Sequence, residues 1–131
     1  MNIGDVAAAT GLPAKTIRFY ESEGLIDRPR RSAGNYRLYD ERHVATLRFI
    51  QQARQLGFSV REVAALVALW RNKRRASADV RRLATAHLRG IDARIAELKR
   101  MQQTLKGLIE RCQGDYRPDC PILDELAEEE Y

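Results

Sequence analysis

The chain has 131 residues, of which 44% are hydrophobic, and its formal net charge is +5. This length suffices for one domain, or for a small domain with a dimerisation arm. No apolar run is long enough to cross a membrane and no signal peptide is recognisable, so we expect a soluble cytoplasmic protein with no membrane role.

The charge is unevenly distributed along the chain. Residues 1–76 carry 14 Lys and Arg against 7 Asp and Glu, a net charge of +7, whereas residues 77–131 carry 9 against 11, a net charge of −2. This asymmetry indicates a first half that binds a polyanion and a second half for association or sensing. The alternative is a surface that is unevenly charged but inert.

The start of the chain predicts two short helices. Asn2 can cap the first, over residues 3–10, and Gly11 ends it. Pro13 suits the start of the second, which we expect to run to about residue 23. Two short helices joined by a turn that contains glycine indicate a helix-turn-helix.

The second predicted helix has a basic polar face. Lys15 and Arg18 are three residues apart on it. At the front of a recognition helix, such side chains can reach base edges or phosphates in the major groove of DNA. A charged face that only meets solvent would show the same pattern.

Residues 25–39 predict a small β-wing. Gly34 and Asn35 form a turn signal, and residues 36–39 alternate as in a short strand. Wing side chains can hydrogen-bond to phosphates and so fix the register on a duplex. The wing residues that we expect to contact DNA in this way are Arg31, Asn35, Tyr36 and Arg37. A loop of solvated arginines is the alternative.

Two further helices follow the wing. Asp40 can cap the first, to about residue 56, and residues 59–62 form a capping box for the second, to about Trp70. Arg54 and the basic hinge at residues 71–75 would extend the phosphate-binding surface.

A long helix is predicted over residues 77–111, about 50 Å in length. Its apolar or small residues step by four and three, which is a heptad seam: Ala84, Leu88, Ile91, Ile95, Leu98, Leu105 and Ile109. The remaining chain is too small to cover this seam. We therefore expect an antiparallel coiled coil with a second copy, with its two-fold axis near residue 94.

Cys112 and Cys120 bracket a loop after the long helix, and Pro121 suits the start of a last short helix, to about residue 127. In a reducing compartment such as the cytosol, two close cysteines form a metal or redox site more often than a disulfide. Two soft thiolates can hold Cu(I), Ag(I) or Au(I) in a linear site. A dithiol redox switch is an alternative, and needs Cα atoms only within about 7 Å.

Zinc is a further alternative for the two cysteines. Zn(II) normally takes four ligands. His43 and His87 lie on other predicted helices, and we interpret them as packing or surface residues. Asp115 and Asp119 lie inside the loop and could complete a Zn(II) site.

Four segments of the chain resemble the MerR family of transcriptional regulators, and together the likeness covers nearly the whole chain. These segments are residues 3–7, 16–25, 35–39 and 56–62. Within the family the chain is most similar to the copper-efflux regulators, on the spacing of Cys112 and Cys120, the residues between and after them, and residues 77–80.

The resemblance implies a homodimer that binds a promoter whose −35 and −10 elements are too far apart for RNA polymerase to engage both. Metal binding would then bend and underwind the DNA, so that RNA polymerase engages both elements and transcription is activated. By the same likeness, Lys15, Arg18 and Tyr20 of the second helix join the wing residues Tyr36 and Arg37 as DNA contacts.

The resemblance also bears on the metal ligands, through the residue at position 77. In the family's sensors of divalent metals, the matching position resembles a third cysteine that the partner chain supplies. Here it is Ser77, which removes a ligand and its charge while remaining close to the partner's metal. Ser77 would also serve as the N-cap of the long helix.

The sequence thus predicts a mostly α fold. We expect a winged helix-turn-helix DNA-binding domain over residues 1–76, a dimerisation helix over 77–111, and a metal-binding loop with a short helix over 112–131. An enzyme does not fit, because no histidine lies near either cysteine and no glycine-rich phosphate loop occurs. A coiled-coil adaptor without a DNA role is the remaining alternative.

Overall fold

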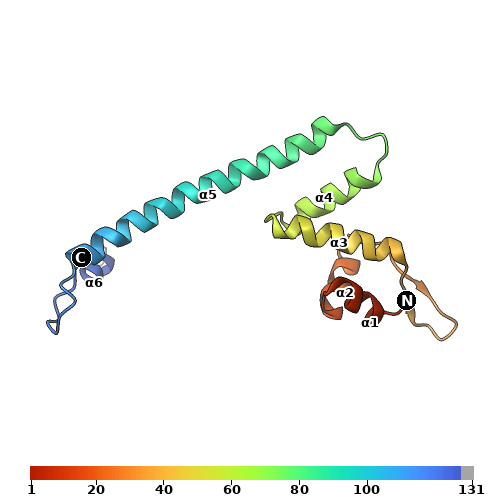
Figure 1. Ribbon diagram of the computed structural model, residues 1–131, viewed down its shortest axis with the longest axis horizontal. Helices are drawn as coiled ribbons and strands as arrows, with labels where there is room; N and C mark the ends of the chain where they lie inside the picture. Colours follow the sequence, from red (N-terminus) through yellow and green to blue (C-terminus); the bar gives the residue numbers. More distant parts are fainter. Residues whose placement is uncertain (128–131) are drawn as a thin grey trace. The chain divides into compact units, whose positions relative to one another are not determined.

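The computed structural model describes residues 1–127, and that part of the chain is mostly helical, as predicted (Figure 1). The predicted C-terminal segment is thus described as far as residue 127, and residues 128–131 lie outside the described residues. The elements in chain order are α1 (Ile3–Thr10), α2 (Ala14–Ser22), β1 (Arg30–Arg31), β2 (Arg37–Leu38), α3 (Glu41–Gln55), α4 (Val60–Arg71), α5 (Ser77–Arg111) and α6 (Pro121–Ala127).

The chain forms two compact units, Met1–Ala84 and Thr85–Tyr131. The boundary lies inside α5, because that helix continues without interruption past the end of the first unit. Within residues 1–127, no helix is both long and apolar enough to cross a membrane.

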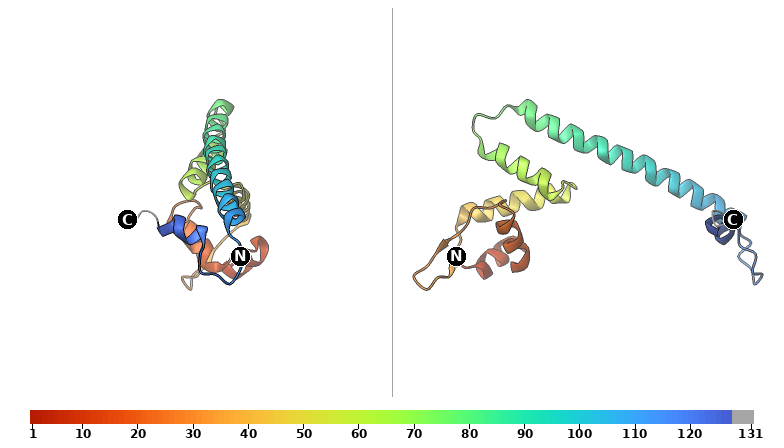
Figure 2. Two further views of the ribbon diagram at one scale, coloured as in Figure 1. Left: turned by 90° about the vertical axis from the view of Figure 1, so that its left-hand side faces the viewer. Right: turned by 180° about the vertical axis from the view of Figure 1, so that it is seen from behind.

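The core of the first unit is built where α1 to α4 meet. Helices α3 and α4 lie side by side in each view (Figures 1 and 2). Full burial of each aliphatic side chain contributes roughly 1.5–3 kcal/mol, so this cluster holds the helices together. The side chains with no exposed surface are those of Val6, Ile17, Leu47, Ile50 and Val63.

Trp70 near the end of α4 lies outside the buried core. Its side chain is 40% exposed. The indole stacks on Phe49 of α3, with ring centroids 4.5 Å apart and planes 7° apart. Trp70 therefore covers the edge of the core and does not enter it.

Capping boxes begin three helices, which explains why their starts were predictable. Asn2 and Asp5 form the box of α1, and Ser59 and Glu62 form that of α4. At α3, the Asp40 carboxylate accepts bonds from the backbone N–H groups of Arg42 and His43. The bond from the His43 backbone is the main cause that holds the pKa of Asp40 below its ordinary value.

The wing is an antiparallel ribbon of β1 and β2, with Arg30 opposite Leu38 and Arg31 opposite Arg37. Asn35 in its turn has a φ of 67°, a left-handed conformation that asparagine tolerates well. The predicted wing therefore exists, although its two strands are only two residues long each.

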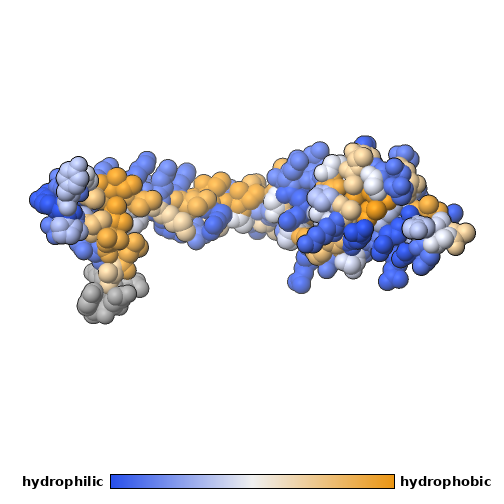
Figure 3. Space-filling view, turned by 90° about the horizontal axis from the view of Figure 1, so that it is seen from below, coloured by the Kyte–Doolittle hydropathy of each residue, from blue (hydrophilic) through white to orange (hydrophobic). Residues whose placement is uncertain are grey.

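Most of the predicted apolar seam of α5 is exposed, and Figure 3 shows hydrophobic residues along this helix. From Leu88 to Ile109 the exposed fraction of each large seam residue lies between 37% and 55%. Near its end, α5 forms an apolar groove of about 410 Å³ that includes Met101, Leu108 and Leu126 of α6. The short helix α6 thus packs against α5 through Leu126.

The substitution Ser59→Ala should lower the free energy of unfolding by about 1 kcal/mol. The Ser59 hydroxyl accepts the Glu62 backbone N–H at 3.1 Å, and alanine would leave that donor without its cap. Urea denaturation followed by circular dichroism measures the change. Ser59→Asp, which retains a capping oxygen, is the control, and equal stabilities of all three proteins would contradict the role of the cap.

Candidate metal centre and nucleic-acid interface

The two cysteines lie at the ends of two helices in the second unit. The Cys112 backbone N–H donates to the carbonyls of Leu108 and Ile109 at 3.2 and 3.1 Å, so it closes the last turn of α5. The Cys120 carbonyl accepts the Asp124 N–H at 2.9 Å and so opens α6. Both cysteines are free of a disulfide and half-buried, and the loop between them is exposed.

In the described part of the chain, no side chain is arranged with the two thiols as a third metal ligand. Within residues 1–127, no group of three or more His, Cys, Asp or Glu side chains is arranged to hold a metal ion. Asp115 inside the loop is held by Arg117, whose Nε and Nη2 lie 2.9 and 2.8 Å from the Asp115 Oδ2. These bonds hold the pKa of Asp115 below its ordinary value.

His43 has a structural role, which agrees with its interpretation as a packing or surface residue. Its Nδ1 lies 3.0 Å from the Asp40 carboxylate, and its Nε2 lies 3.0 Å from the carbonyl oxygen of Asp27. His87 is half-buried on α5. Neither histidine belongs to a metal-binding cluster in the described chain.

The predicted N-cap role of Ser77 is wrong by one position. Ser77 is already the first residue of α5, and it is exposed. The Asp79 N–H donates to the carbonyl of Ala76 at 3.0 Å, so the helix is opened by the residue before Ser77. That Ser77 lies beside the metal of the partner chain stays a prediction.

Helix α2, the predicted recognition helix, has exposed side chains at Lys15 and Arg18, which agrees with the predicted polar face. Tyr20 is different, because only 8% of it is exposed and it belongs to the core of the first unit. Ile17 and Tyr20 are three residues apart, so they share the buried face of the helix. A DNA contact from Tyr20 is therefore restricted to the small part of its surface that remains open.

The wing residues fall into two groups. Arg31, Asn35 and Tyr36 are exposed, with Tyr36 at 75%, and the Arg31 guanidinium bonds to the Asn35 carbonyl at 3.2 Å. Arg37 is half-buried, and its Nε lies 3.4 Å from the Oε1 of Glu21 on α2. The first group is open to a ligand, whereas Arg37 is partly engaged within the protein.

Glu21 also accepts a hydrogen bond from the Tyr39 hydroxyl at 3.0 Å. Tyr39 is 3% exposed, and burial, together with this bond, raises its pKa to about 12. Glu21 and Tyr39 are 18 residues apart, so no local pattern in the sequence indicates this contact.

Arg54 and some residues of the basic hinge form hydrogen bonds within the protein, although they were predicted only as phosphate contacts. The Arg54 guanidinium donates to the Phe58 carbonyl at 2.7 Å and so closes the turn between α3 and α4. Arg75 donates to the Trp70 carbonyl at 3.1 Å, at the end of α4. Both residues are exposed, so these bonds leave part of each side chain open.

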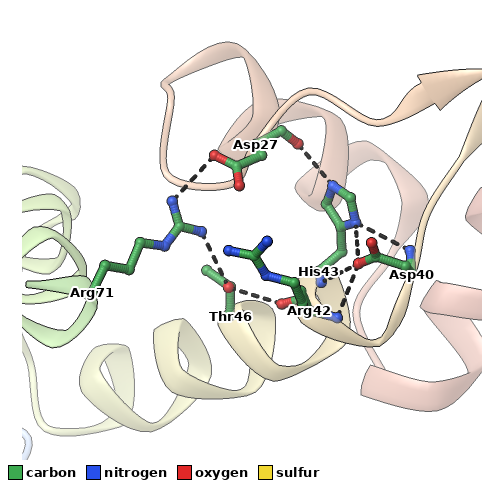
Figure 4. Close-up of a pocket in the computed structure, with 6 residues that line it drawn as sticks. All are labelled: Asp27, Asp40, Arg42, His43, Thr46 and Arg71. Carbon is green, nitrogen blue, oxygen red and sulfur yellow. Dashed lines mark hydrogen bonds and ion pairs between the residues drawn. The ribbon is translucent and has the colours of Figure 1, made fainter. Parts of the chain in front are cut away.

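Arg71 of the hinge borders a polar pocket of about 40 Å³ (Figure 4). It donates to the Asp27 carboxylate at 3.2 Å and to the Thr46 hydroxyl at 3.3 Å. These bonds join the end of α4 to the start of the wing segment and to α3. The partners are far apart in the sequence, so no local signal could have indicated them.

Comparison with known proteins agrees with this architecture. Residues 1–69 match the family described as MerR HTH family regulatory protein, and residues 44–108 match the one described as MerR, DNA binding. The chain belongs to the MerR family. It is therefore a DNA-binding transcriptional regulator and not an enzyme.

Relatives of this MerR-family chain are similar over nearly their whole length. The HTH-type transcriptional regulator HmrR of Rhizobium leguminosarum bv. viciae is 52% identical over 98% of both chains. The regulator CueR of Salmonella typhimurium is 46% identical over 97% of this chain and 92% of its own. The lead(II) complex of PbrR691 from Ralstonia metallidurans has a TM-score of 0.88 and 35% identity, over 97% of this chain and 99% of that one.

Tyr39 should ionise at a higher pH than an ordinary tyrosine. Its pKa is raised on folding from about 10 to about 12. The neutral phenol therefore stabilises the fold fully below pH 10, and this contribution is lost as the pH rises through 12. Tyrosinate absorbance should show a step near pH 12 that Tyr39→Phe removes, and an unchanged titration in that variant would contradict the assignment.

Proposed function

We propose that this metal-responsive MerR-family regulator binds promoter DNA as a homodimer and activates transcription when a monovalent soft metal ion binds at Cys112 and Cys120. Cu(I) is the first candidate, and Ag(I) or Au(I) would suit the same donors. The observation that carries this proposal is the donor set: two half-buried thiols at the ends of α5 and α6, with no third ligand arranged beside them in the described chain.

The donor chemistry favours a monovalent ion. Thiolates are soft ligands and suit Cu(I), and two of them around a single positive charge leave a net charge of −1. Zn(II) normally takes four ligands, and the Asp115 carboxylate is already paired with Arg117. When bound, the metal would supply a bond between the end of α5 and the start of α6.

Similarity to relatives does not select the metal by itself. The PbrR691 structure contains lead(II), whereas HmrR and CueR are more similar to this chain in sequence. Ser77 supports the monovalent ion. The family resemblance implies a cysteine at the matching position in sensors of divalent metals, and this chain has a serine there. A hydroxyl adds neither a soft ligand nor a negative charge.

The exposed seam of α5 supports the dimer. A row of large apolar side chains that remain 37–55% exposed gains burial when a second copy covers it. In an antiparallel pair with its two-fold axis near residue 94, Ser77 of one chain would lie near Cys112 of the other. The metal loop of each protomer would then adjoin the start of the partner's α5, and Ser77 would lie near the partner's metal.

The first unit would contact the DNA. We assign base-edge or phosphate contacts to Lys15 and Arg18 of α2 and phosphate contacts to Arg31, Asn35, Tyr36 and Arg37 of the wing. Tyr20 and Arg54 would act mainly through the packing and the turn that they stabilise. Metal binding at the loops would distort the duplex so that RNA polymerase can use the promoter.

An anaerobic titration of the reduced protein with Cu(I) and Zn(II), against competing chelators, tests the metal centre. We expect one tight Cu(I) per chain and weak Zn(II), because two thiolates satisfy Cu(I) but leave Zn(II) with too few ligands. Cys112→Ser or Cys120→Ser should abolish tight Cu(I) binding and leave DNA binding intact.

Other outcomes of this titration would replace the proposal. Tight Zn(II) would mean that further side chains complete a divalent site. The absence of any tight metal, combined with reversible oxidation of the two cysteines, would indicate a dithiol redox switch.

The substitution Arg18→Ala tests the DNA interface. It should weaken binding to a preferred duplex by roughly 1–3 kcal/mol if Arg18 contacts a base, or reduce the salt slope by about one if it contacts a phosphate. Cu(I) binding should not change. Lys99→Ala removes an exposed charge from the middle of α5 and is the matched control. Equal affinities of both variants would contradict the assigned role of Arg18.

A further inference from the structure

Glu21 places a carboxylate between the recognition helix and the wing. Its Oε1 accepts the Tyr39 hydroxyl at 3.0 Å and lies 3.4 Å from the Nε of Arg37. The side chain of Glu21 is only 15% exposed, and Tyr39 is 3% exposed. A single acidic group of α2 thus joins the residues at the base of β2.

Arg37 is only partly satisfied by this arrangement. Its Nε is buried and makes no hydrogen bond within the described residues, so the contact with Glu21 is an ion pair without hydrogen-bond geometry. About a third of the Arg37 side chain remains exposed. The inner part of the guanidinium is therefore held by the protein while its outer part remains open to a ligand.

The surroundings of Glu21 are basic. Lys15 and Arg18 lie on the same helix, and the charge of Arg18 is close enough to Tyr39 to act on its ionisation. Next to the wing, a groove of about 450 Å³ is lined by Glu21 together with Arg28 and Arg31. A carboxylate on such a surface repels phosphates, so its presence lowers general attraction to DNA.

We propose that Glu21 is a positioning residue for DNA recognition. Its carboxylate fixes Arg37 and Tyr39 of the wing against the recognition helix, which raises sequence discrimination and lowers non-specific affinity. This inference rests on the proposed function, because it concerns the same DNA interface.

The physical basis is preorganisation. Recognition helix and wing must engage adjacent parts of one duplex, so a fixed relation between them selects one register. An arginine that is ordered before binding loses less side-chain freedom when it meets a phosphate. Without Glu21, the basic side chains would still attract any duplex. The orientation of the wing relative to the helix would be less well fixed, so one register would be selected less strongly.

The test compares Glu21→Gln with Glu23→Gln. Both remove one negative charge near the end of α2, but Glu23 is exposed and is the C-cap residue that follows the helix. The probes are a duplex that the wild-type protein selects from a random-sequence pool and a scrambled duplex of the same composition. Fluorescence anisotropy at several salt concentrations gives both affinities.

We expect both variants to bind the scrambled duplex more tightly than the wild type. Glu23→Gln should strengthen binding to both duplexes equally and so retain the specificity ratio. Glu21→Gln should lower that ratio by roughly 5- to 100-fold, the range of one or two lost specific contacts. In the background of Arg37→Ala, the Glu21→Gln substitution should lower the ratio much less.

Three results would overturn the inference. An unchanged specificity ratio in Glu21→Gln would show that the carboxylate only repels phosphate. Independent losses in Glu21→Gln and Arg37→Ala would show that the two residues do not act together. A wild-type protein that selects no duplex would overturn the proposed function itself, and this inference with it.

Folding is controlled separately. Circular dichroism should show the same helix content in Glu21→Gln as in the wild type. If that variant does not fold, Tyr39→Phe tests the same contact, because it keeps the buried ring and removes only the hydroxyl bond to Glu21. Tyr39→Phe should then lower the specificity ratio, and an unchanged ratio would overturn the inference.

Discussion

The exposed apolar seam of α5 is the constraint on which the proposed assembly depends. A helix of 35 residues presents large aliphatic side chains that remain about half exposed. In a coiled coil, such a seam is covered by a partner helix, and the partner determines where the ends of both helices lie. The cysteines are placed at one end of this helix and Ser77 at the other, so the covering of the seam would decide which residues meet around a metal.

The elements that sequence analysis predicted well depend on local signals. The caps at Asn2, Asp40 and Ser59 define helix starts, because their partners lie only two or three residues away. The interactions that it missed join distant positions, such as Glu21 with Tyr39 and Asp27 with Arg71. Tyr20 was predicted as a DNA contact from the family resemblance, whereas its spacing of three residues from Ile17 is the local signal that agrees with its burial.

Some basic residues of the first unit form hydrogen bonds within the protein. Arg54 closes the turn between two helices, and Arg71 links the hinge to the start of the wing segment. Each of these bonds orders an arginine before any ligand arrives, which reduces the entropy that binding must overcome. The net charge along the chain therefore indicates attraction to a polyanion. The intramolecular bonds determine which arginine side chains have a defined orientation.

The stack of Trp70 on Phe49 has a consequence for spectroscopy. Trp70 is the only tryptophan in the chain, so the indole emission of the protein comes from one site. That site is 40% exposed at the end of α4, directly before the hinge at residues 71–75. Changes in the packing of α3 against α4 will alter the solvent around the indole. The protein thus contains its own fluorescent reporter beside the hinge, without any added label.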